Sequence, residues 1–225
     1  MKTNGKRILA AGLVLLALFL LWTVLIRTVD VQPAGVNGTN VGFAAVNTWF
    51  HQLTGVHMRV YTITDWLGLV PIVICAGFGI LGLVQWIRRK SLLKVDADIL
   101  LLGAYYIVVI LAYLVFEMIP INYRPILIDG AMEASYPSST TLLVLSVMPT
   151  LKFQTDRRAE KPAVKAAVTA FVILFSAFMV IGRLTAGVHW LTDIIGAVLL
   201  STGLYLTYRA CVAFADRKKK EEPAA

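Results

Sequence analysis

Apolar residues gather along this chain into six long runs, and short polar segments separate them. The runs cover residues 8–26, 66–87, 97–116, 137–154, 165–182 and 190–208. A helix that crosses the hydrocarbon core of a bilayer needs about 20 apolar residues, and each run is close to that length. The pattern therefore predicts an all-α protein: a bundle of six transmembrane helices that forms one integral membrane domain over residues 1–225.

The composition indicates the same class of protein. Hydrophobic residues make up 58% of the chain and charged residues only 15%, whereas a soluble domain has about 25% charged residues. This leaves too little polar surface for a soluble globule, and it also argues against a disordered chain or a secreted disulfide scaffold. Cys75 and Cys211 lie far apart in apolar stretches of sequence, and their spacing predicts neither a disulfide nor a metal site.

The basic residues indicate which way the spans point. If the N-terminus is cytoplasmic, one face of the six-span arrangement carries 17 of the 21 lysines and arginines. The opposite face keeps only Arg27, Arg59, Arg124 and Arg183. Because cytoplasmic loops are enriched in positive charge, we expect both termini in the cytoplasm of a multi-pass protein of the cell membrane. The basic clusters lack interleaved aromatic residues, which argues against nucleic-acid binding and leaves contacts with membrane lipids as their role.

The first run and the loop after it carry two further expectations. The run 8–26 is longer than the 7–15 apolar residues of a signal peptide, which favours a retained membrane anchor. In the outer loop 27–65, Val46, Phe50 and Leu53 recur at helical spacing. This predicts a short helix that lies in the membrane interface.

Three polar segments stand at the outer ends of the predicted spans. They are Glu117–Pro125, Tyr136–Thr141 and Gly182–Asp193. Ionisable residues in or near membrane spans usually face a protein interior or a wet cavity, so they are functional candidates by default. Because all three segments fall on the same predicted face, we expect them to form one site there.

The residue types in two of these segments favour phosphate as the ligand. Arg124 and Arg183 can offer a planar fork of donors to phosphate oxygens. Pro137 suits the first position of a helix, so its first turn would offer free backbone N–H groups and hydroxyls to an anion. The residues of that turn are Ser138, Ser139 and Thr140. The alternatives are structural: arginines that reach the interface and an ordinary helix cap.

His189 and Asp193 are the candidate reactive pair. They are four residues apart, so on a helix they share one face. A carboxylate that binds one ring nitrogen fixes the tautomer and leaves a lone pair on the other nitrogen, which could act as a base or attack phosphorus. A structural ion pair is the alternative for this pair alone, but the combination of all three segments favours a phosphate site.

These motifs resemble those of the type-2 phosphatidic acid phosphatase superfamily, whose signature is K-x6-R-P, P-S-G-H and S-R-x5-H-x3-D. Arg183, His189 and Asp193 fall at the spacing of the third motif, with Gly182 in place of its serine. From the other two motifs, Arg124-Pro125 and Pro137-Ser138 match. The order of the segments and the six predicted spans resemble the family as well.

The resemblance implies a membrane lipid phosphatase that acts at the outer face without a metal or cofactor. His189 would attack the phosphorus and form a phosphohistidine, and Asp193 would orient its ring. Arg124, Arg183 and backbone groups near Ser138 and Ser139 would hold the phosphoryl oxygens, and water would release the phosphate.

Two positions depart from the family pattern. Glu117 replaces the first lysine, and Thr140 replaces the histidine that would protonate the leaving group. Three interpretations remain: a lipid diphosphate substrate, such as an isoprenyl diphosphate, whose leaving group needs little protonation; another proton donor; or a silent protein that binds or transports lipid phosphates without cleaving them. Glu117 is the main candidate donor if burial raises its pKa, and Tyr136 is a second. Alternatively, Glu117 pairs with Arg124.

Overall fold

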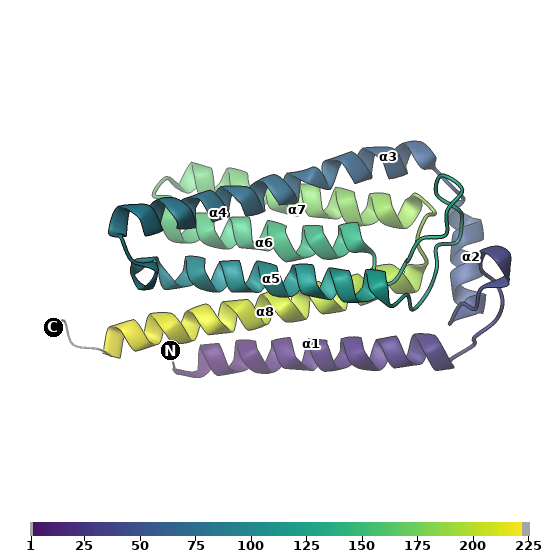
Figure 1. Cartoon of the computed structure of the whole chain (residues 1–225), viewed down its shortest axis with the longest axis horizontal. Helices are drawn as coiled ribbons and strands as arrows, with labels where there is room; N and C mark the ends of the chain where they lie inside the picture. Colours follow the sequence, from purple (N-terminus) through teal and green to yellow (C-terminus); the bar gives the residue numbers. More distant parts are fainter. Residues whose placement is uncertain (1, 222–225) are drawn as a thin grey trace.

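The chain forms a bundle of long helices, seen in a computed structural model that describes residues 2–221 (Figure 1). Its helices are α1 (Lys2–Thr28), α2 (Ala44–Thr54), α3 (Met58–Leu67), α4 (Leu69–Arg89), α5 (Ala97–Met118), α6 (Ser139–Arg158), α7 (Pro162–Thr185) and α8 (Leu191–Glu221). Short 3-10 turns lie at Val36–Gly38 and Leu92–Lys94. The all-α prediction is confirmed.

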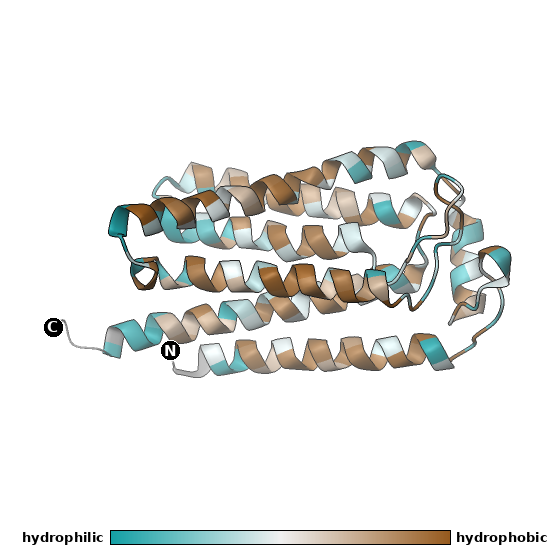
Figure 2. Cartoon of the chain, viewed as in Figure 1, coloured by the Kyte–Doolittle hydropathy of each residue, from teal (hydrophilic) through white to brown (hydrophobic). Residues whose placement is uncertain are grey.

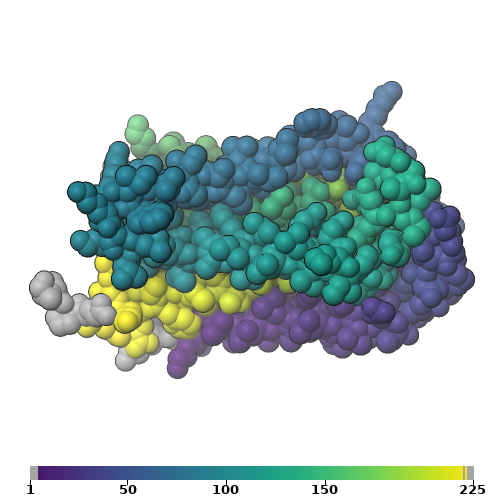
Figure 3. All heavy atoms as spheres, viewed as in Figure 1, coloured from purple at the N-terminus to yellow at the C-terminus, as the bar shows by residue number. Residues whose placement is uncertain are grey.

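The bundle has two distinct ends. α1 packs along α8, and α6 packs between α7 and α8. α1 begins and α8 ends at one end of the bundle, whereas α2 and the segment between α5 and α6 lie at the other end (Figure 1). In the space-filling view these two segments cover that second end together (Figure 3). The arrangement places the beginning of α1 and the end of α8 on the same side of the bundle.

Within residues 2–221, five segments are long and apolar enough to cross a membrane. They are Gly5–Thr28, Met58–Arg89, Ala97–Met118, Pro162–Thr185 and Leu191–Lys219. Apolar residues cover the middle of these helices, and polar residues collect toward the ends (Figure 2). Many of the apolar side chains are exposed, as on a surface that contacts lipid. The protein is therefore a multi-pass membrane protein.

The fourth predicted span, 137–154, is the exception. It forms helix α6, but this helix is too polar to count among the five apolar segments. Ser146, Thr150 and Gln154 of this helix are buried inside the bundle. Because α6 contacts α4, α5, α7 and α8, protein rather than lipid surrounds it. A sixth membrane crossing by α6 stays a prediction.

The predicted outer loop contains more helix than its sequence indicates. The expected short helix in this loop is confirmed as α2. The end of the loop is also helical, because α3 leads directly into α4 and the helical segment begins at Met58 rather than at residue 66. Polar residues such as Thr64 and Asp65 lie just before the apolar run, and they contact Arg183 of α7.

Candidate active site

The first and third polar segments meet against one face of α3. Tyr61 lies under both arginines: its ring centre is 5.6 Å from the guanidinium carbon of Arg124 and 4.9 Å from that of Arg183. An apolar cluster around Tyr61 joins the α5–α6 segment to the α7–α8 turn through Ile128 and Val188. The predicted convergence of these two segments is confirmed.

Two glycines allow this close approach. A Cβ atom on Gly182 would lie 2.7 Å from the Thr64 side chain, so glycine lets α7 bring Arg183 against α3. Gly187 has a φ of +70°, and a Cβ there would lie 2.0 Å from the carbonyl oxygen of Gly55. Glycine at 187 therefore fits both the backbone conformation and the contact between the α7–α8 turn and the end of α2.

Both arginines are buried and have unused donors. Arg183 is 1% exposed, and its Nη1 lies 3.4 Å from Thr64 Oγ1 and 3.7 Å from Asp65 Oδ1. Arg124 is 8% exposed, and its Nη2 lies 3.0 Å from Glu133 Oε2. Among the described residues, Arg183 Nε and Arg124 Nε and Nη1 find no hydrogen-bond partner. Unmet buried donors are costly, and an anion between the two side chains would satisfy them.

His189 is 3% exposed and presents one free nitrogen. Its Nε2 has no hydrogen-bond partner within residues 2–221. Its Nδ1 lies 3.1 Å from Ser135 Oγ and 3.8 Å from Asp193 Oδ2. The two residues are within reach of each other, as predicted, but 3.8 Å is too long for a hydrogen bond, and the Ser135 hydroxyl donates to Asp193. His189 also precedes the first residue of α8, so the pair does not share a helix face.

Asp193 is fully buried and connects several elements. Its Oδ2 accepts the backbone N–H of Trp190 at 2.8 Å, and its Oδ1 lies 3.4 Å from the side-chain nitrogen of Asn122. Its carbonyl oxygen accepts the N–H of Ser138 at 3.2 Å. Asp193 thus fixes the second polar segment against the start of α8.

The electrostatics keep the imidazole neutral. Burial lowers the pKa of His189 to about 4; Asp193 opposes this shift, and the nearby positive charges of Arg124 and Arg183 add to it. At neutral pH the ring therefore carries one proton and one lone pair.

The start of α6 differs from the prediction at Pro137 and Ser138. α6 begins at Ser139, and Pro137 lies before it, after a cis peptide bond from Tyr136. Ser138 is fully buried, its N–H donates to Asp193 and its hydroxyl donates to Thr141 Oγ1 at 3.1 Å. Both of its donors are therefore used within the protein. Ser139 and Thr140 are half-buried in the first turn of α6, where backbone N–H groups lack partners within the helix.

The two candidate proton donors have unequal surroundings. Glu117 is exposed, so it lacks the burial on which its proposed role depends. The alternative in which Glu117 pairs with Arg124 is also wrong, because the carboxylate at Arg124 is that of Glu133. Tyr136 is buried with its hydroxyl 2.8 Å from Thr23 Oγ1, and burial raises its pKa, which makes it a poorer acid.

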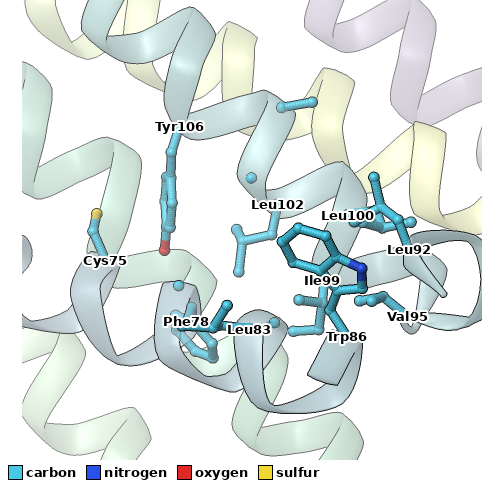
Figure 4. A pocket seen from close by; sticks show the side chains of 14 residues that line it. Cys75, Phe78, Leu83, Trp86, Leu92, Val95, Ile99, Leu100, Leu102 and Tyr106 are labelled. Atoms are coloured by element: carbon cyan, nitrogen blue, oxygen red, sulfur yellow. The ribbon is translucent and has the colours of Figure 1, made fainter. Parts of the chain in front are cut away.

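An apolar groove extends from the start of α6 along the seam between α4 and α5. Its part near the site, about 540 Å³, includes Asp65, Ser139 and Thr140. Its second part, about 420 Å³, continues toward the other end of the bundle (Figure 4). Cys75 and Tyr106 line both parts, and Trp86 and Leu92 lie at the far end. Asp65 also contacts Arg183, so the groove begins beside the arginines.

Several residues of this site gave no clear signal in the sequence. Tyr61 and Thr64 belong to the predicted outer loop, where neither carries a charge or matches a motif. Ser135 and Glu133 lie just before the second motif. Their polarity was the only available signal, and it does not indicate what they contact.

The chain is similar to known proteins over most of its length. The family model of the PAP2 superfamily matches residues 99–217, which include Arg124, Arg183 and His189. Among solved structures, the chain is similar to the first transmembrane PAP2 type phosphatidylglycerolphosphate phosphatase from Bacillus subtilis, with a TM-score of 0.59 and 20% identity. That match covers 94% of this chain and 98% of the other, and at this identity it establishes the fold. Among curated proteins, none matches this sequence.

Proposed function

The chain belongs to the PAP2 superfamily, and from this premise we propose that it is a lipid phosphatase that acts through a phosphohistidine on His189. The observation that carries the proposal is a set of four buried nitrogen atoms without partners in the described chain: Nε and Nη1 of Arg124, Nε of Arg183 and Nε2 of His189. The first three are donors suited to phosphate oxygens, and the fourth, in a neutral ring, is the candidate nucleophile.

The proposed reaction has two steps. In the first, the Nε2 lone pair of His189 attacks phosphorus and forms an N–P bond, while the bond from phosphorus to the leaving oxygen breaks and that oxygen keeps the electron pair. In the second, water attacks the phosphohistidine, the N–P bond breaks and Nε2 regains its lone pair. The proton that the water loses balances the charge of the departed oxygen. Arg124, Arg183 and the free N–H groups at the start of α6 stabilise the phosphoryl oxygens.

The groove between α4 and α5 supports a lipid as the substrate. α4 has 21 residues, so at 1.5 Å per residue it is about 31 Å long, close to the thickness of a bilayer core at about 30 Å. Groove-lining residues follow one face of α4 from Leu69 to Trp86. We propose that the phosphate binds at the arginines while the hydrocarbon chain lies in this groove.

The departure at Thr140 supports a diphosphate headgroup. A threonine hydroxyl does not supply a proton near neutral pH, and the loss of a general acid typically costs about 10²–10⁴-fold in rate. A leaving phosphate is a far weaker base than an alkoxide and needs this proton less. We therefore propose an isoprenyl diphosphate as the preferred substrate, with phosphate monoesters cleaved more slowly.

The positions of the charges support an outward-facing site in the cell membrane. The site lies at the end of the bundle opposite the start of α1 and the end of α8. Most of the basic residues belong to the helix ends and turns at that opposite end, including Arg88 and Arg89 in the last turn of α4 and Lys90 at its C-cap. By the positive-inside rule that end is cytoplasmic.

A silent lipid-phosphate-binding protein is the second candidate. It is favoured by the carboxylates near the arginines, Asp65 at 3.7 Å from Arg183 and Glu133 at 3.0 Å from Arg124, together with the missing acid at Thr140. Such a protein would bind the headgroup without forming the N–P bond.

The test is phosphate release by the purified full-length protein. The panel contains phosphatidic acid, phosphatidylglycerophosphate and an isoprenyl diphosphate, and His189→Ala is the control. We expect release to be fastest from the diphosphate and to vanish in the variant. Equal rates on monoesters would remove the leaving-group argument. Retained binding with no release from any member would instead support the silent protein.

A further inference from the structure

Ser135 occupies the position between the two residues of the proposed reactive pair. It is 1% exposed, and its hydroxyl oxygen lies 3.1 Å from His189 Nδ1. The same hydroxyl donates to Asp193 Oδ2, whereas His189 and Asp193 themselves are 3.8 Å apart. Asp193 therefore reaches the imidazole through the serine rather than directly.

The number of protons that Asp193, Ser135 and His189 can offer determines which residue donates in each hydrogen bond. A carboxylate only accepts hydrogen bonds, and a serine has one hydroxyl proton. Since Ser135 gives that proton to Asp193, its oxygen can only accept from His189, which requires the imidazole proton on Nδ1. The lone pair is then on Nε2, the nitrogen without a partner in the described part of the chain.

The serine is itself held in place on its backbone side. Its N–H donates to the carbonyl oxygen of Asn122 at 2.9 Å. The side-chain nitrogen of Asn122 lies 3.4 Å from Asp193 Oδ1. Asn122 and the Ser135 hydroxyl therefore both bond to the carboxylate of Asp193. The hydroxyl thus has a defined position from which it can hold the imidazole ring.

We propose that Ser135 is a positioning residue that holds His189 in the Nδ1–H tautomer and so keeps Nε2 free to attack phosphorus. The inference rests on the proposed function for its catalytic consequence, but the tautomer is a property of the protein without substrate. The hydroxyl of Ser135 bonds to His189 and Asp193 rather than to an arginine among the described residues, so its removal should change the ring and leave the phosphate-binding groups in place.

The direct test is nitrogen NMR of the histidine side chains in the full-length protein. The chain has three histidines, so His189→Ala identifies the signals of His189. At pH 7 without substrate we expect Nδ1 protonated and Nε2 unprotonated in the wild type. The proton should divide between the two nitrogens in Ser135→Ala and return to Nδ1 in Ser135→Thr, which keeps the hydroxyl.

A matched control is Ser201→Ala, because Ser201 is a buried serine of α8 whose hydroxyl bonds to the carbonyl of Val198. It should leave the His189 signals unchanged. The charged groups around His189 are Asp193 on α8, Arg183 on α7 and Arg124 before α6, and all three are present in each serine variant. A change in the signals of Ser135→Ala can therefore be assigned to the missing hydroxyl.

Kinetics on the best substrate of the panel provide the second measurement. We expect Ser135→Ala to lower kcat roughly 10–100-fold, the range typical of outer partners that orient metal-ligating histidines, with KM unchanged and activity rescued by Ser135→Thr. A wild-type His189 protonated on Nε2 would overturn the proposal, even if the alanine variant does not fold. An unchanged tautomer and rate in Ser135→Ala would also overturn it. If no lipid phosphate is hydrolysed, the proposed function fails while the tautomer result still decides the role of Ser135.

Discussion

The two ends of the bundle both hold buried charges, but they hold them differently. At the end opposite the candidate site, Asp98 is 6% exposed and accepts hydrogen bonds from Arg157 at 3.0 Å and Arg158 at 2.9 Å. Its backbone carbonyl also lies 3.4 Å from the hydroxyl of Tyr208. At the site end, Arg124 and Arg183 are equally buried, yet three of their nitrogens lack partners among residues 2–221.

This difference distinguishes a structural ion cluster from a candidate ligand site. The partners of Asp98 come from the end of α6, so its charge joins α5 to α6 and needs nothing from outside. The arginines at the other end retain unused donors, and a buried donor without a partner costs about 1–3 kcal/mol. A phosphate group would supply the missing acceptors. We therefore expect changes at the two ends to affect different properties of the protein.

The largest difference should appear in activity. In the proposed reaction, Arg183→Gln removes a charge that would face the transferred phosphoryl group, and the loss of one such donor typically costs about 10²–10³-fold in kcat. The matched variant Asp98→Asn lies at the other end and should keep the wild-type kcat per folded molecule. Steady-state kinetics on the best lipid substrate measure both. Equal losses in the two variants would show that the comparison between the ends is wrong.

Phosphate itself should distinguish the two ends through stability. Inorganic phosphate that binds the folded arginine site stabilises it by about 2.7 kcal/mol at 100 times its Kd. Thermal unfolding in detergent should show an upward shift of the midpoint in wild type and in Asp98→Asn. The shift should be absent in Arg183→Gln. The same shift in all three proteins would place the bound phosphate elsewhere.

Loss of the Asp98 carboxylate should reduce stability without phosphate. Asp98→Asn weakens charge-assisted hydrogen bonds to two arginines, which we expect to cost about 1–3 kcal/mol in the free energy of unfolding. Asp216→Asn is the matched control, because Asp216 pairs with Arg157 at 2.7 Å but is exposed. An exposed pair contributes about 0–1 kcal/mol, so a larger effect of Asp216→Asn in the same unfolding assay would contradict the prediction.

The smallest predicted effect concerns the apolar groove between α4 and α5, which extends from the site end of the bundle toward the opposite end. Gly79 lines the groove, whereas Gly77 of the same helix does not, and both have open space at the Cβ position. Gly79→Leu should displace about two methylene groups of a bound chain, worth about 0.8 kcal/mol each, and raise KM roughly tenfold for a long-chain lipid. Gly77→Leu should not raise it, and neither variant should affect a short-chain analogue.

Much of the fold could be predicted because the membrane imposes a simple rule on sequence. Long apolar runs correspond to α1, α4, α5, α7 and α8, and the helical spacing in the outer loop corresponds to α2. α3 was missed because its polar residues Thr64 and Asp65, which contact Arg183, lie just before the apolar run. The same rule describes α6 poorly, because a helix surrounded by other helices needs no apolar surface toward lipid.

The site was predictable in its parts but not in its connections. Arg124, Arg183 and His189 lie where the motif spacing indicates, since each follows or ends a helix at the same end of the bundle. The partner of Arg124 depends instead on how the α5–α6 segment folds. An antiparallel bridge between Tyr123 and Ala134 brings Glu133 beside Arg124, and no spacing along the chain indicates this pairing. Ser135 reaches His189 through the same local fold.

The polar character of α6 has a consequence for the biogenesis of the protein. Membrane insertion of a single helix depends on how well lipid solvates it, and a helix with buried Ser146, Thr150 and Gln154 is poorly solvated by acyl chains. We expect α6 to enter the bilayer only together with neighbours that cover these side chains. Insertion of α6 and its packing against the other helices would then occur together. A mutation that weakens the packing of α5 or α8 against α6 would prevent α6 from entering the membrane.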